Sequence, residues 1–181
     1  MSKITRSNIT TSQTIGPFSH EGWQWAVDFC APARLQTTAP VITITGTVYD
    51  GDGNPVDDAQ IEAWLPEAAD AEAGLEIPGF RRTPTGKSGE FGLRLSAPQR
   101  PAGEPVAYVT VFARGLTKHQ FTAVFLEDDP TLAESAILEQ VPAARRATLI
   151  ARKTGDAAYH WDIRLQAAGE TAQETAFFDY V

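Results

Sequence analysis

Residues 41–65 read VITITGTVYDGDGNPVDDAQIEAWL, and this stretch decides the fold class of the chain. Apolar residues alternate with threonines over 41–48, the period of two that is typical of a strand with one buried face. The segment 50–55 is dense in Asp, Gly, Asn and Pro, which favour tight turns. Alternation resumes over 59–65, so the stretch predicts two strands joined by a turn.

Similar patterns continue to the end of the chain. Further alternating or apolar runs occur at 91–95, 106–113, 121–126, 147–153 and 159–166. The run 106–113 is almost continuously apolar, which suits a central strand buried on both faces. The last two runs flank Thr154-Gly155-Asp156 and predict a hairpin. Asp129-Pro130 can begin one short helix that ends at residue 140. The pattern predicts an all-β fold, a β-sandwich of mainly antiparallel strands.

The chain divides into two parts. Residues 1–40 predict an irregular N-terminal arm, because prolines interrupt it and its aromatic residues show no sheet periodicity. Such aromatic residues must pack on the body of the domain or on another subunit. Residues 41–181 predict the sandwich. Within it, 66–84 is a long acidic stretch that we expect to be a loop, either functional or a linker.

Composition excludes several classes of protein. The net charge is −8 and the pI is about 4.8, which argues against a nucleic-acid partner and gives no support for docking on an anionic membrane. The single cysteine, Cys30, permits no disulfide within the chain and no cysteine-based zinc cluster, and it favours a reducing cytoplasm. No apolar run approaches the roughly 18 residues of a membrane span.

Common catalytic motifs are absent from the sequence. It contains no G-x-S-x-G elbow, no phosphate-binding GxxxxGK[ST] loop and no H-E-x-x-H pair. Asp50, Asp52, Asp57 and Asp58 resemble calcium ligands in type, but the EF-hand spacing fails and a solvated turn is the better interpretation. The three histidines are isolated in the sequence, and we expect surface or hydrogen-bonding roles for them: they are His20, His119 and His160.

Several segments together resemble the intradiol ring-cleavage dioxygenases. The segments are 12–18 (SQTIGPF), 46–56 (GTVYDGDGNPV), 61–64 (IEAW), 112–115 (FARG), 145–151 (RRATLIA), 162–166 (DIRLQ) and 177–180 (FFDY). Each motif is weak alone, but together they cover nearly the whole chain in the order of the family. They are most similar to the alpha-type subunits of the two-subunit members that act on protocatechuate.

The resemblance implies a division of labour between two chains. In these members homologous alpha and beta subunits pair, and the pairs form higher-order assemblies. The beta subunit holds Fe(III) with two tyrosines and two histidines. The complex opens the ring of protocatechuate with O2 and yields 3-carboxy-cis,cis-muconate. The resemblance therefore implies an enzyme subunit that is active only with an iron-bearing beta partner.

The residues bear on whether this chain holds iron itself. A ferric site of this kind needs tyrosinate and imidazole ligands. The two family histidines lie one residue apart on a strand, and the matching positions here are Val106 and Tyr108. The segments 67–78 and 98–105, where the family tyrosines lie, contain no tyrosine. We therefore expect the iron in the partner and not in this chain.

Four positions match family residues that line the active-site mouth of the beta subunit: Thr14, Gly16, Pro17 and Arg114. Gly16 lets backbone approach a ligand closely, and Pro17 presets a bend. Arg114 offers a permanent positive charge to a substrate carboxylate. The alternatives are a plain surface turn for 14–17 and a structural ion pair for Arg114 at the end of its strand.

Two other functions stay open from the sequence. The chain could be a stand-alone β-sandwich binding or assembly module that descends from the dioxygenases and has lost catalysis. An active single-chain catechol dioxygenase is a third reading, but it requires iron ligands that the sequence lacks.

Overall fold

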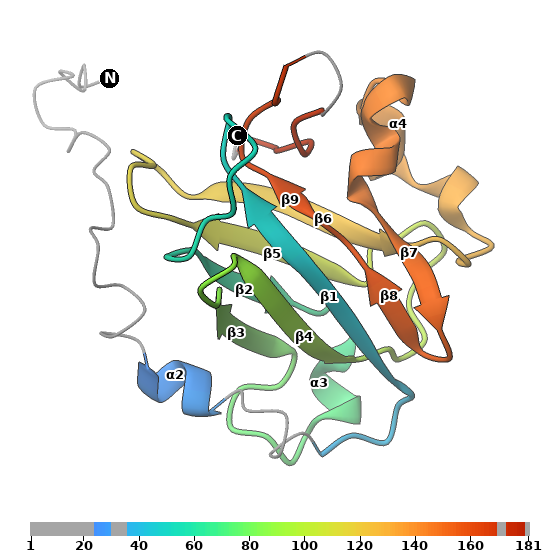
Figure 1. Ribbon diagram of the computed structural model, residues 1–181. Coiled ribbons are helices and arrows are strands. Elements are labelled where there is room, and N and C mark those ends of the chain that lie inside the picture. Colours follow the sequence, from blue (N-terminus) through green and yellow to red (C-terminus); the bar gives the residue numbers. More distant parts are fainter. Residues whose placement is uncertain (1–23, 30–35, 170–172, 180–181) are drawn as a thin grey trace, which may run out of the picture.

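The computed structural model describes residues 24–29, 36–169 and 173–179 (Figure 1). The strands in these residues are β1 (Val41–Tyr49), β2 (Gln60–Trp64), β3 (Phe80–Pro84), β4 (Glu90–Ser96), β5 (Ala107–Phe112), β6 (Gln120–Leu126), β7 (Ile150–Gly155), β8 (Ala158–His160) and β9 (Ile163–Arg164). The helices are α2 (Gln24–Phe29), α3 (Ala68–Ala71) and α4 (Ala136–Gln140), with 3-10 turns η3 (Leu132–Glu134) and η4 (Ala143–Leu149). None of these helices is long and apolar enough to cross a membrane.

The strands form one hydrogen-bonded path that folds over on itself into two layers. Its order is β3-β2-β5-β6-β7-β8-β1-β4, with β9 beside β1. Five of the pairings are antiparallel, and β1 with β8, β1 with β9 and β6 with β7 are parallel. Figure 1 shows β4, β1 and β8 crossing in front of β2, β5 and β6. The predicted all-β sandwich is confirmed.

The predicted alternation along β1 is also confirmed. Ile42, Ile44 and Val48 are buried, whereas the threonines between them are exposed or half-buried. Gly46 takes the remaining inward position because a Cβ there would lie 1.8 Å from the carbonyl oxygen of Trp161. Trp161 crosses close over β1 and donates its indole N–H to the carbonyl of Thr148 at 2.9 Å. This crossing separates β8 from β9.

The turn after β1 is held by its own first residue. The carboxylate of Asp50 accepts the backbone N–H groups of Asp52 at 2.9 Å and Asn54 at 2.8 Å. These bonds, that from Asn54 above all, lower the pKa of Asp50 against the smaller effect of burial. Gly53 has a φ of 82°, which only glycine adopts without strain. The predicted turn chemistry is therefore present.

Three elements differ in detail from the expectations. Residues 66–84 are not a plain loop, because they contain α3 and β3. The expected helix over 129–140 begins only at Ala136, because the carboxylate of Asp129 accepts from Thr131 at 2.8 Å in a turn, while Ser135 caps α4 by accepting from Leu138 at 3.2 Å. The arm contains α2, where the side-chain amide of Gln24 donates to Asp28 one turn away at 3.0 Å.

A buried ion pair closes the seam between the two ends of the strand path. Glu72, just after α3, is 0% exposed, and both of its oxygens bond the guanidinium of Arg81 on β3. The Ser96 hydroxyl and the Gly79 N–H also donate to Glu72. Arg81 in turn donates its Nε–H to the Arg94 carbonyl of β4 at 3.0 Å. Side chains thus join β3 to β4 where no backbone ladder does.

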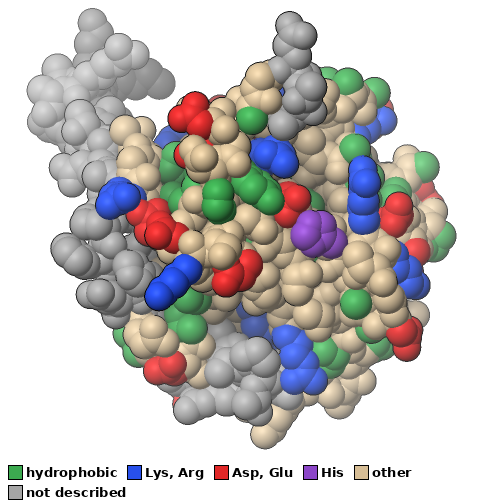
Figure 2. All heavy atoms as spheres, in the orientation of Figure 1, with side chains coloured by type: hydrophobic (Ala, Val, Ile, Leu, Met, Phe, Trp, Pro, Cys, Tyr) green, Lys and Arg blue, Asp and Glu red, His purple; other side chains and the backbone are tan. Residues whose placement is uncertain are grey.

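The charged surface is mixed in sign where it can be seen. Figure 2 shows one face of the molecule, on which the acidic and basic side chains of the described residues are interspersed. That face offers no concentrated positive charge to a phosphate backbone.

We predict that Glu72→Gln destabilises the fold by about 3–5 kcal/mol, because it leaves the buried Arg81 without its counter-charge. Burial opposes ionisation of Glu72, but the bonds from Arg81, Ser96 and Gly79 outweigh it and hold its pKa below the ordinary value. A carboxyl with a lowered folded pKa stabilises above its unfolded pKa, and this contribution disappears as pH falls through the folded pKa.

Urea unfolding of wild type and Glu72→Gln at neutral pH and along an acid series measures this effect. The difference between the two proteins should be largest at neutral pH and shrink in acid. The exposed neighbour Glu76 supplies the control Glu76→Gln, which should change little. An equal loss for both variants would contradict the structural role of the pair.

Candidate active-site surface

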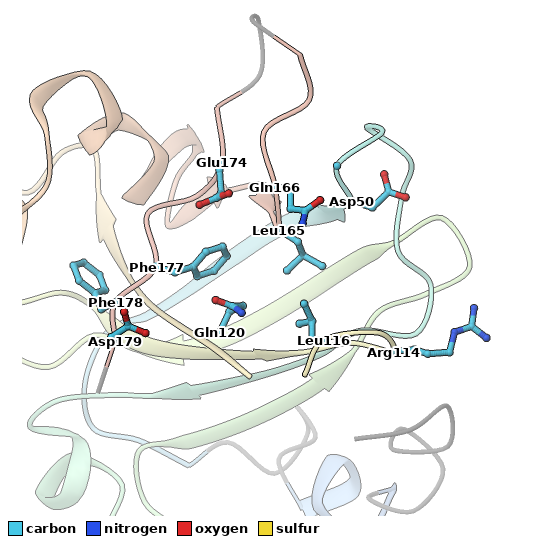
Figure 3. Close-up of a pocket in the computed structure, with 11 residues that line it drawn as sticks. Asp50, Arg114, Leu116, Gln120, Leu165, Gln166, Glu174, Phe177, Phe178 and Asp179 are labelled. Carbon is cyan, nitrogen blue, oxygen red and sulfur yellow. The ribbon is translucent and has the colours of Figure 1, made fainter. Parts of the chain in front are cut away.

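A pocket of about 470 Å³ brings together segments that are far apart in the sequence (Figure 3). Its lining comes from the turn after β1, the segment after β5, the start of β6, the residues after β9 and the C-terminal stretch. The lining residues are Asp50, Gly51, Arg114, Leu116, Gln120, Leu165, Gln166, Glu174, Phe177, Phe178 and Asp179. Parts of four of the segments that carry the family resemblance therefore meet on one surface: they belong to 46–56, 112–115, 162–166 and 177–179.

The pocket has an apolar floor and polar edges. Leu116, Leu165 and Phe177 project toward one another in Figure 3 and pack against the main core. Arg114 lies at the edge, with its side chain extended away from the two phenylalanines. A concave apolar surface with a few polar groups is typical of a site that meets a small ligand or another chain.

Arg114 is positioned by the strand ladder. It follows β5, and its Nε lies 3.1 Å from Oδ2 of Asp58, which precedes β2. The ion pair that the sequence left open is therefore present. However, the side chain of Arg114 is 67% exposed while that of Asp58 is 16% exposed, so most of the guanidinium remains accessible. The other three predicted site residues, Thr14, Gly16 and Pro17, lie outside the described residues.

The two positions that match the family histidines do not fit an iron site. Val106 is 3% exposed, belongs to the main apolar core and carries no donor atom. Tyr108 donates its hydroxyl to Oε2 of Glu104 at 2.8 Å and stacks on Phe121 with ring centroids 6.0 Å apart. Burial first, and then the bond and charge of Glu104, raise the pKa of Tyr108 to about 12. The phenol is therefore held in its neutral form at ordinary pH.

The two segments that match those carrying the family tyrosines make structural ion pairs instead. In 67–78 the buried Glu72 binds Arg81, and in 98–105 the guanidinium of Arg100 pairs with Asp129. His119 packs its ring against Phe112, and His160 approaches Asp162 at 3.1 Å. Within residues 24–29, 36–169 and 173–179, no three His, Cys, Asp or Glu side chains are arranged to hold a metal ion.

Gln60 is a buried polar residue that no sequence pattern singles out. It is the first residue of β2, two residues after Asp58, and it is 0% exposed. Neither its side-chain oxygen nor its nitrogen has a hydrogen-bond partner in the part of the chain that the structure describes. A buried amide without partners costs free energy, so Gln60 lowers the free energy of unfolding at a position close in sequence to Asp58.

We predict that Gln60→Met raises the free energy of unfolding by about 1–3 kcal/mol, because the thioether keeps the volume and removes the unpaired groups. Chemical denaturation of the two proteins measures the change. Gln99→Met, at an exposed position before β5, is the matched control and should have no effect. A destabilised Gln60→Met variant would show that the amide is satisfied in solution.

Several solved structures that resemble this chain are dioxygenases. The chain is similar to the dioxygenase domain of a dioxygenase–carbohydrate-binding fusion protein from Streptomyces sp. SirexAA-E, with a TM-score of 0.55 and 19% identity over 77% of this chain and 83% of that one. It is also similar to an intradiol ring-cleavage dioxygenase from Tetranychus urticae, with a TM-score of 0.50 and 12% identity over 71% and 81% of the two chains. The fold is thus that of the intradiol dioxygenases.

A third structure, catechol 1,2-dioxygenase from Pseudomonas arvilla C-1, has a TM-score of 0.53 and 18% identity over 77% of this chain. This chain spans 56% of that protein's length. The likeness to these structures concerns the fold alone.

Relatives of known sequence define the family more narrowly. The chain is 34% identical to the protocatechuate 3,4-dioxygenase alpha chain of Burkholderia cepacia, over 97% of this chain and 100% of that protein. It is 35% identical to the alpha chain of Pseudomonas putida, over 94% and 96%. No model of a protein family matches. The chain belongs to the family of protocatechuate 3,4-dioxygenase alpha chains.

Proposed function

We propose that this chain is the non-iron-binding alpha subunit of a protocatechuate 3,4-dioxygenase. With a beta subunit that carries the Fe(III), it forms an enzyme that cleaves protocatechuate with O2 to 3-carboxy-cis,cis-muconate. The proposal depends on one combination of observations. The chain matches an alpha chain over its full length, and Val106 and Tyr108 stand at the positions of the family histidines.

The chemistry of those two positions supports an iron site in another chain. A hydrocarbon side chain at Val106 cannot ligate any metal. Tyr108 has a pKa raised to about 12 and already donates its proton to Glu104, whereas ferric coordination requires the phenolate. Iron at this place would have to disrupt a packed core and a formed hydrogen bond.

This chain contributes the wall of a pocket in the proposed complex. The accessible guanidinium of Arg114 supplies positive charge near the site, which favours a substrate that carries a carboxylate. We assign Thr14, Gly16 and Pro17 of the arm to the same wall, where they exclude water from the partner's centre. In this proposal residues 1–40 pack on the beta subunit and residues 41–181 form the body.

The proposed setting is a cytoplasmic assembly of αβ units. A single cysteine suits a reducing compartment. The apolar floor of the pocket, with Leu116, Leu165 and Phe177, suits an interface whose centre is protected from water.

Co-expression with a longer homologue that carries the tyrosine and histidine ligands tests the proposal. A burgundy complex with intradiol activity is the expected result, because the partner supplies the ferric centre. The competing function is a stand-alone binding or assembly module. A stable monomer that ignores such a partner would favour that module and contradict the proposal.

We predict that Arg114→Ala, in the reconstituted complex, raises the KM for protocatechuate by roughly 10- to 100-fold, the range expected for a lost hydrogen bond to a charged group. Iron content should not change. Steady-state oxygen uptake and metal analysis measure the two quantities. Arg152→Ala, an exposed arginine on β7, is the control and should leave KM unchanged. Unchanged kinetics for Arg114→Ala would remove this residue from the site.

A further inference from the structure

Asp58 and Arg114 lie just beyond the end of the ladder between two neighbouring strands. The last pair of the ladder between β2 and β5 is Gln60 with Phe112. Asp58 precedes β2 by two residues, Arg114 follows β5 by two residues, and both lie in turns. The end of the ladder therefore brings the two segments close together, and the side chains meet there, with Nε of Arg114 3.1 Å from Oδ2 of Asp58.

The side chains of Asp58 and Arg114 differ in length and exposure, and this difference decides which of them positions the other. Asp58 has a short side chain that is largely covered, at the point where the turn enters β2. Arg114 has a long, exposed side chain with many rotamers, and it lies in the turn after β5 beside Gly115, which has a φ of 90°. Asp58 is the anchored member, so it restricts Arg114 more than Arg114 restricts it.

The contact leaves the far end of the guanidinium available. The recorded approach is between Nε of Arg114 and Oδ2 of Asp58, at 3.1 Å. Among the described residues, the two terminal amino groups of Arg114 make no hydrogen bond. A guanidinium recognises a carboxylate with two parallel N–H groups along one edge. Asp58 approaches the Nε side, and among the described residues the edge formed by the two terminal amino groups has no hydrogen-bond partner.

We infer that Asp58 is a positioning residue, which holds Arg114 so that its terminal amino groups meet the carboxylate of an aromatic substrate in the neighbouring subunit. The inference rests on the proposed function. Asp58 touches no reacting atom in this account and acts through Arg114.

Asp58 has two opposing effects on substrate binding. It positions Arg114, which favours binding, and it offsets the positive charge of Arg114, which disfavours binding. The exposed guanidinium sits in water, where the Coulomb interaction of the pair is weak and screened by salt. Ordering a free arginine on binding is the larger cost. Removal of Asp58 therefore weakens substrate binding.

The test uses the reconstituted αβ complex and two substrates, protocatechuate and 4-methylcatechol, which has no carboxylate. Asp58→Asn should raise the KM for protocatechuate roughly three- to tenfold, the cost expected for one immobilised side chain. It should leave kcat and the KM for 4-methylcatechol within twofold. Asp58→Glu should restore part of the effect. Asp57→Asn removes the neighbouring exposed charge and should change nothing.

A double-mutant cycle with Arg114→Ala separates positioning from a general structural role. In the Arg114→Ala background, Asp58→Asn should have no further effect on KM. An equal loss with both substrates, an additive effect in the cycle or a fall in KM for protocatechuate would each overturn the inference while the proposed function stands. A complex in which Arg114→Ala itself is silent would overturn both the inference and the assigned role of Arg114.

Discussion

The antiparallel register between β2 and β5 is the constraint on which this structure depends. It pairs Ile61 with Val111 inside the core and, on the opposite face, Trp64 with Tyr108. A slip of either strand by one residue would turn its core residue outward, so the buried face fixes the register. Asp58 and Arg114 lie in the turns just beyond the end of this ladder, where their side chains approach to 3.1 Å. The two paired strands thus carry the core on one side and end beside the exposed positive charge.

The strand that would carry metal ligands in the proposed partner serves stability in this chain. Val106 is part of the main core, and Tyr108 is held neutral by burial and by Glu104. At the two ends of the strand path, Glu72 binds Arg81, and this ion pair helps to join β3 to β4. The accessible positive charge of Arg114 lies instead at the edge of a pocket with an apolar floor. This distribution supports the proposed division of labour between two chains.

Local periodicity was sufficient to predict the sandwich, since β1 and β5 carry clear patterns and the turn at 50–55 carries its own hydrogen-bond chemistry. It did not predict β3, because the two arginines in this strand interrupt the apolar pattern. One of them is buried only through its ion pair with Glu72. The sequence pattern also began the helix at Asp129-Pro130, whereas Ser135 caps α4, because both residue types are good caps and only tertiary packing chooses between them. The pairing of Arg114 with Asp58 and the unsatisfied Gln60 depend on the alignment of distant strands, which no local pattern contains.

The location of the iron is the most direct test of the central claim. The chain is expressed alone with ample iron, purified and compared by metal analysis and ring-cleavage assay with the complex formed with a beta-type partner. We predict stoichiometric iron and turnover in the complex only, because the positions that would bind the metal here hold a valine and a neutral tyrosine. Tightly held, stoichiometric iron in the isolated chain, together with ring-cleaving turnover, would contradict the account.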